Sequence, residues 1–199
     1  MMAESAKNPN HPKKGSTIKV DPIKKVRDIK AIKKMLHDKP RDLCLFTLGI
    51  NTNLRASDLL RITAGMVKDL KPEDELTLKE KKTGKHRRIT LNKAAIAAIK
   101  GLLACRDYED DDPLFVGQRG CLSVPSVNRL VKSWCKSINL KGNYGSHTLR
   151  KTFGYHQRVT FGVSVPELMV VFNHASQRET LEYLCIQPEE VKSIYLNEL

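Results

Sequence analysis

Six residues of this 199-residue chain have side chains that could together break a phosphodiester bond. An arginine fork binds two non-bridging phosphate oxygens, and a histidine or lysine can move protons near neutral pH. A tyrosine hydroxyl can attack phosphorus as a covalent nucleophile. In chain order the six residues are Arg55, Lys82, His147, Arg150, His174 and Tyr183. Their types predict phosphoryl transfer if the fold brings them together.

Taken one at a time, these residues have ordinary explanations. Arg55 and Lys82 stand beside expected turns, where basic residues usually lie on the surface. Tyr183 stands between two leucines, as a tyrosine that packs in a core does. His147 and Arg150 lie three apart on one predicted helix and so share a face, although such a pair also occurs on solvated helix surfaces. A proton carrier would then lie beside a phosphate-binding fork.

The charge of the chain favours a polyanionic partner. The net charge is +13, of which the first 40 residues carry +7. A basic domain with a basic arm is typical of nucleic-acid binding. The alternative is a basic surface that serves solubility alone.

Several other classes of protein are disfavoured. The five cysteines are scattered, and no C-x-x-C pair is present, so we expect reduced thiols and no structural zinc site. No apolar run approaches the roughly 18 residues of a membrane span. The polar N-terminus lacks the apolar stretch of a secretory signal. We therefore expect a cytoplasmic protein with no cofactor and no bound metal.

The hydrophobic pattern predicts a mainly α-helical fold with a small antiparallel β-sheet (α+β). A hairpin is expected from two alternating stretches joined by the turn at Thr83-Gly84. Asn92 is expected to cap the helix that follows the hairpin. Helices are predicted over residues 26–39, 42–50, 55–62, 92–103, 123–134, 147–159, 165–172, the segment after 176, and 188–199.

We divide the chain into three parts. Residues 1–22 are expected to form a flexible basic arm, because they have little to bury. Residues 23–187 are expected to form one domain that contains all six candidate residues. Residues 188–199 are expected to form a helix that docks on a neighbouring protomer.

The order and spacing of the six residues resemble the tyrosine recombinases, also called the phage integrase family. Asn53-Leu54-Arg55-Ala56-Ser57-Asp58-Leu59 is similar to the family's first arginine box, and Lys82-Thr83-Gly84-Lys85 to its hairpin lysine motif. His147-Thr148-Leu149-Arg150 is similar to the H-x-L-R box. Asn173-His174-Ala175-Ser176, with Thr180 and Tyr183, is similar to the segment that ends at the nucleophile. The resemblance implies the fold of a tyrosine recombinase catalytic domain.

The resemblance also implies a role for each residue. Tyr183 would attack the DNA phosphorus and form a 3′-phosphotyrosyl bond, and Arg55 and Arg150 would bind the non-bridging oxygens. Lys82, with Lys85 as the alternative, would protonate the leaving 5′-oxygen. His147 would serve as an acid–base partner, and His174 would donate a hydrogen bond to the phosphate. The reaction would need neither ATP nor a metal ion.

Further basic residues are expected to contact the DNA backbone. They are Lys85, Arg87, Lys151, Lys13 and Lys14. Three positions depart from the family pattern. Asn53 and Asn173 each replace a glycine, and asparagine suits such positions when the backbone needs a positive φ. Lys151 stands where many members have histidine.

The resemblance implies a site-specific recombinase or integrase that acts on double-stranded DNA as a tetramer on paired sites. Accessory DNA-bending proteins would be further partners. The protein would be associated with the nucleoid in the cytoplasm and be encoded by a prokaryote, a phage or a mobile element. Two alternatives remain open. One is a type IB topoisomerase-like enzyme that acts as a monomer. The other is a non-catalytic DNA-binding or regulatory relic of the family.

Overall fold

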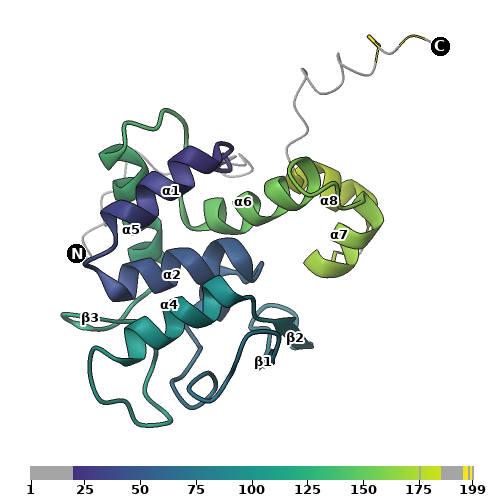
Figure 1. Ribbon diagram of the computed structural model, residues 1–199. Helices are drawn as coiled ribbons and strands as arrows, with labels where there is room; N and C mark the ends of the chain where they lie inside the picture. The colour runs from purple at the N-terminus through teal and green to yellow at the C-terminus, as the bar shows by residue number, and fades with distance from the viewer. Residues whose placement is uncertain (1–19, 175, 185–194, 197, 199) are drawn as a thin grey trace, which may run out of the picture.

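The computed structural model describes residues 20–174, 176–184, 195, 196 and 198. Over these residues the chain forms a mainly helical fold with two small antiparallel sheets of two strands each, which confirms the predicted fold class (Figure 1). In chain order the elements are α1 (Val26–Met35), α2 (Pro40–Asn51), α3 (Ala56–Leu59), β1 (Glu75–Lys79), β2 (His86–Thr90), α4 (Lys93–Leu103), β3 (Val116–Gly117), β4 (Gly120–Cys121), α5 (Val124–Ser137), α6 (Ser146–Val159), α7 (Val165–Phe172) and α8 (Gln177–Leu184).

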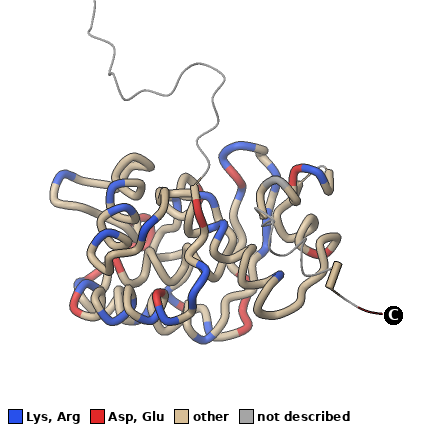
Figure 2. The backbone as a smooth tube through the Cα atoms, turned by 90° about the horizontal axis from the view of Figure 1, so that it is seen from above, with Lys and Arg blue, Asp and Glu red and all other residues tan. Residues whose placement is uncertain are grey.

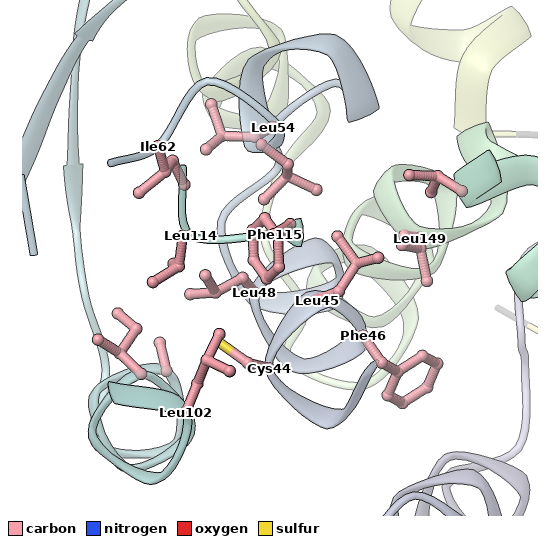
Figure 3. Packing of buried hydrophobic residues seen from close by; sticks show 14 of the residues in the cluster. Cys44, Leu45, Phe46, Leu48, Leu54, Ile62, Leu102, Leu114, Phe115 and Leu149 are labelled. Carbon is pink, nitrogen blue, oxygen red and sulfur yellow. The ribbon is translucent and has the colours of Figure 1, made fainter. Parts of the chain in front are cut away.

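Helix α2 lies at the centre of the main core, as its apolar sequence predicts. Its residues Cys44, Leu45, Phe46 and Leu48 are fully buried. They pack with residues from α4, α6 and the segment before β3, as Figure 3 shows. Burial of each large side chain contributes roughly 1.5–3 kcal/mol relative to exposure. The core therefore provides a rigid base for the residues that follow α2.

Two glycines let α6 approach its neighbours closely. A Cβ atom on Gly49 of α2 would lie 2.5 Å from the Leu149 side chain of α6. A Cβ atom on Gly154 of α6 would lie 2.6 Å from the ring of Phe172 in α7. Larger residues at either glycine would push these helices apart. The close packing fixes α6, which carries His147 and Arg150, against both α2 and α7.

The β1–β2 hairpin has the register that the alternation predicts. Glu75 pairs with Thr90 and Lys79 with His86, and Gly84 takes a φ of +67° in the connecting loop. Leu76 and Leu78 point inward. Asn92 caps α4 by accepting a hydrogen bond from the Ala95 amide at 2.9 Å, as predicted. The hairpin thus presents its loop, residues 80–85, next to α3.

Helices α7 and α8 pack on each other and on α6, at the end of α6 that lies away from the main core (Figure 1). They enclose a second small hydrophobic cluster around Leu168, Phe172 and Leu184. Ser164 and Glu167 form a capping box at the start of α7. We call α7 and α8 the C-terminal pair.

One predicted helix differs in length from the observed element, and another lies mostly outside the described residues. The predicted helix over 55–62 was too long, because α3 ends at Leu59. The carbonyl of Ile62 instead accepts a hydrogen bond from the Leu114 amide at 2.9 Å, so this stretch pairs with the segment before β3. The predicted helix over residues 188–199 falls almost entirely outside the described residues, as does most of the predicted arm over 1–22.

Candidate functional site

Arg55 is placed by a left-handed turn that follows α2. Asn53 has a φ of 54°, as expected where asparagine replaces glycine. Arg55 then occupies the position before the first residue of α3. Its side chain is 17% exposed, and its Nη1 lies 3.1 Å from the Glu80 carboxylate. The turn therefore directs the guanidinium toward the base of the hairpin loop.

Arg150 is buried and joins two of the sequence boxes. Its Nη1 donates to the Asn53 carbonyl at 2.7 Å, and its Nη2 donates to the Phe172 carbonyl at 2.9 Å. Burial lowers the pKa of Arg150 to about 10, and the nearby positive charge of Arg55 acts in the same direction. A guanidinium has five N–H groups, so two hydrogen bonds to carbonyls leave donors for an anion.

His174 and Tyr183 lie together beside Arg150. Their ring centroids are 5.5 Å apart, and both rings pack on Phe172. The guanidinium carbon of Arg150 lies 5.7 Å from the Tyr183 ring centroid. His174 Nδ1 lies 3.1 Å from the Thr180 hydroxyl, which orients the imidazole. The C-terminal pair thus brings two predicted residues against the arginine of α6.

Electrostatic interactions link His147 and Lys82 to the other candidate residues. Loss of solvent lowers the pKa of His147, and the charges of Arg150, Lys151, Arg55 and Lys82 lower it further. The pKa of His174 is also lowered, mainly by desolvation. The charge of Glu179 opposes this shift, whereas those of Arg150, Arg55 and Lys82 add to it. Lys82 lies in the exposed hairpin loop. The charges of Arg55 and Lys82 therefore act on both imidazoles and favour their neutral forms.

Glu80 is a central residue that the sequence interpretation missed. Its side chain is fully buried at the start of the hairpin loop, 3.1 Å from Arg55 and 2.9 Å from Arg87. The Thr83 hydroxyl donates to it at 2.8 Å. Burial alone would raise its pKa, but these hydrogen bonds and charges outweigh burial and lower the pKa to about 2. Leu76 and Leu78 alternate inward, and Glu80 is the next position in this alternation. A carboxylate at an inward position is the feature of the sequence that indicates a buried, paired glutamate.

We expect this carboxylate to make the fold sensitive to acid. A carboxyl whose pKa is lower in the folded state stabilises the fold above its unfolded pKa, here about 4.5, and the contribution disappears as the pH falls toward 2. The loss should be of the order of 2 kcal/mol. Denaturant unfolding between pH 6 and pH 2.5 measures it. Glu80→Gln should lack this part of the pH dependence, and an equally steep loss in that variant would exclude Glu80 as its source.

Asp58 was also missed as a functional residue, although it stands within the first arginine box. It is 1% exposed, and its Oδ1 accepts a hydrogen bond from the Lys81 amide at 2.9 Å. This bond fixes the hairpin loop to α3 at the residue before Lys82. The signal in the sequence was its position, since Asp58 is an acidic residue only three positions after Arg55.

The residues expected to contact the DNA backbone differ in their surroundings. Lys85 is exposed in the hairpin loop, and Lys151 Nζ lies 5.5 Å from the Tyr183 ring centroid. Lys13 and Lys14 lie outside the described residues. The Arg87 side chain is only 12% exposed, and its two terminal nitrogens bond to Glu80 and to the Val171 carbonyl. These bonds point to an internal role for Arg87, and its predicted phosphate contact stays untested.

Lysines and arginines are distributed over the whole described backbone, with acidic residues between them (Figure 2). Within the described part of the chain, no group of three or more His, Cys, Asp and Glu residues could hold a metal ion. None of the described helices combines the length and hydropathy of a membrane span.

Residues 24–190 match the model of a protein family described as the phage integrase family. The chain is 34% identical over 181 residues to the probable integrase/recombinase YoeC of Bacillus subtilis, covering 88% of this chain and 95% of that protein. It is 33% identical over 159 residues to the tyrosine recombinase XerC of Caldanaerobacter subterraneus subsp. tengcongensis, covering 77% of this chain but only 44% of that protein.

Solved structures show the same fold. The crystal structure of XerA recombinase superposes with a TM-score of 0.73 at 18% identity, covering 92% of this chain and 66% of that chain. The XerH site-specific recombinase, bound to a palindromic difH substrate in a post-cleavage complex, gives a TM-score of 0.68 at 19% identity over 86% of this chain and 52% of that chain.

Proposed function

Since this chain belongs to the phage integrase family, the tyrosine recombinases, we propose that it cuts and rejoins DNA through a covalent bond to Tyr183. The observation that carries the proposal is the packing of Tyr183 against His174 and beneath the Arg150 guanidinium. The charges of Arg55 and Lys82 reach the same region. In this proposal the site combines a nucleophile, an anion-binding fork and proton carriers.

The proposed cleavage exchanges one phosphoester bond for another. The Tyr183 oxygen attacks phosphorus, the bond from phosphorus to the 5′-oxygen breaks, and a 3′-phosphotyrosyl bond forms. His147, whose lowered pKa favours the neutral base, accepts the tyrosine proton. Lys82 donates a proton to the leaving 5′-oxygen. Rejoining is the reverse reaction with a 5′-hydroxyl, and it needs no ATP because the energy of the bond is conserved.

The anion-binding groups stabilise the transition state. Arg55 and Arg150 would bind the two non-bridging oxygens, where negative charge develops, and His174 would donate a hydrogen bond to one of them. The contacts that hold these groups before substrate binds, to Glu80, Asn53 and Phe172, reduce the cost of arranging them.

The decisive experiment traps the covalent intermediate. A duplex with a nick next to the cleavage site loses its short 5′-hydroxyl fragment, so cleavage cannot be reversed. The protein should then form a DNA adduct that survives denaturing electrophoresis, and mass spectrometry should locate the phosphodiester on Tyr183. The DNA can be taken from the flanks of the element that encodes the protein. Absence of any adduct with these sites would contradict the proposal.

The partners are proposed on the same basis. The Tn1549 transposon integrase is described in complex with circular intermediate DNA, and we propose double-stranded DNA as the substrate here, with four copies acting on paired sites. Analytical ultracentrifugation with a short site duplex should show higher-order complexes. A protein that stays monomeric on DNA and relaxes supercoiled plasmid without sequence preference would instead be a type IB topoisomerase-like enzyme.

Replacement of Lys82 by alanine should slow cleavage by about 10²–10⁴-fold, the usual contribution of a general acid. A substrate with sulfur in place of the 5′-bridging oxygen has a leaving group that needs no proton, so it should restore most of the rate. The measured quantity is the single-turnover rate of adduct formation at saturating DNA.

Lys85→Ala is the matched variant for this experiment. It removes a positive charge from the same loop, so it should weaken DNA binding while the rate at saturating DNA stays close to that of the unmodified protein. If Lys85→Ala shows the large defect and the sulfur rescue instead, Lys85 is the general acid.

A further inference from the structure

Four segments that carry candidate residues meet at the end of α7. The Val171 carbonyl accepts hydrogen bonds from Asn53 Nδ2 at 2.9 Å and from Arg87 Nη2 at 2.6 Å. The next carbonyl, that of Phe172, accepts from Arg150. The last carbonyls of a helix have no partner within the helix and carry the negative end of its dipole. Side chains from outside the C-terminal pair therefore cap α7.

Among these caps, only Arg87 comes from the hairpin. Its Nη1 bonds to Glu80 at 2.9 Å while its Nη2 bonds to Val171, so one rigid guanidinium spans the two elements. Glu80 in turn contacts Arg55. A continuous path of polar contacts thus runs from α3, through the base of the hairpin loop, to the end of α7.

Among the described residues, the hydrophobic cluster of the C-terminal pair includes no residue of the hairpin. The buried residues of the C-terminal pair form their own cluster around Leu168, Phe172 and Leu184, separate from the main core. The pair contacts α6, and the bond from Arg87 to the Val171 carbonyl links it to the hairpin. Two residues beyond Val171, the chain turns through Asn173, with a φ of 55°, and reaches His174. A shift of the α7 end would therefore move His174 directly.

We infer that Arg87, held by Glu80, is a positioning residue that sets the α7 end, and with it His174, relative to Arg55 and the hairpin. The role rests on the proposed DNA cleavage but assigns Arg87 no contact with DNA. Arg87 acts through the Val171 carbonyl and the Glu80 carboxylate. The side chain is only 12% exposed and its two terminal nitrogens bond to Glu80 and Val171. This environment suits an internal link better than a surface contact.

Arg88 provides a matched control on the same strand. It is the next residue of β2, its side chain is 74% exposed, and it pairs with Glu75 at 3.5 Å. Arg87→Met and Arg88→Met each remove one positive charge from β2. Differences between the two variants therefore report the internal contacts of Arg87 rather than the charge of the strand.

We expect Arg87→Met to slow adduct formation at saturating DNA by about 10- to 100-fold, since a misplacement of about 1 Å in an active site can cost 10²-fold. Its dissociation constant for DNA and the salt dependence of binding should match those of Arg88→Met. Arg87→Lys keeps the charge but lacks the planar fork, so it should stay slow. Full recovery in Arg87→Lys, or a loss of affinity with an unchanged rate in Arg87→Met, would overturn the inference.

Amide hydrogen exchange tests the link without any reaction. The Asn173 and His174 amides donate to Val170 and Met169 at the end of α7, and their exchange should accelerate in Arg87→Met but not in Arg88→Met. Equal exchange in the two variants would refute the link. This measurement stays decisive even if the protein forms no DNA adduct at all, so failure of the proposed function and failure of the inference give different results.

Discussion

Tyr183→Phe is expected to abolish covalent trapping of DNA while leaving DNA binding intact. The substitution removes the single atom that would bond to phosphorus, and loss of a covalent nucleophile costs on the order of 10⁶-fold in rate. The aromatic ring remains, so its contacts with Phe172 and His174, with centroids 5.0 and 5.5 Å away, are kept. The free energy of unfolding should change by no more than about 1 kcal/mol.

The measurement compares adduct yield on the nicked duplex with DNA affinity from a mobility-shift titration. Tyr195→Phe is the matched control, because Tyr195 is the next tyrosine after Tyr183 in the chain and is 84% exposed. It should trap DNA as the unmodified protein does. If Tyr183→Phe traps normally and Tyr195→Phe does not, the nucleophile is Tyr195. Site binding without an adduct from the unmodified protein would identify a non-catalytic relic.

The sequence predicted local backbone conformations better than the long-range bonds around the candidate site. The left-handed turn before Arg55 could be expected, because asparagine replaces glycine at residue 53 and tolerates a positive φ. The long-range contact of the Asn53 side chain could not be predicted from the sequence. This side chain bonds to the Val171 carbonyl, 118 residues further along the chain. Local conformation follows from residue type, whereas such a long-range bond depends on how α7 packs.

Glu80 is a second residue whose position could be predicted from the sequence but whose partners could not. The alternation of Leu76 and Leu78 predicts that residue 80 points inward, and a carboxylate there demands a positive partner. The hairpin and its phase were thus predictable, but the identity of the partners was not. Arg55 and Arg87 come from different elements, and both were first interpreted as phosphate ligands. The three-dimensional arrangement distinguishes them, because Arg87 bonds to both Glu80 and the Val171 carbonyl, whereas Arg55 contacts Glu80 alone among these partners.

Arg150→Ala should combine a large catalytic defect with a loss of stability. An arginine that neutralises charge in a phosphoryl-transfer transition state contributes on the order of 10³–10⁵-fold in rate. The same substitution leaves the carbonyls of Asn53 and Phe172 without their buried donor. Unsatisfied buried polar groups cost about 1–3 kcal/mol each. Part of that cost is offset, because burial disfavours the charged guanidinium, as its lowered pKa indicates.

The two effects are separated by a second variant. Arg150→Lys keeps a positive charge and most of the side-chain volume, but it cannot bond to both carbonyls and a phosphate in one plane. We expect it to recover most of the lost stability and still cleave at least about 10²-fold more slowly. Thermal unfolding and single-turnover adduct formation measure the two effects on the same samples. Near-normal cleavage by Arg150→Lys would mean that charge alone is needed at this position and that the forked geometry of Arg150 serves only to hold Asn53 and Phe172 in place.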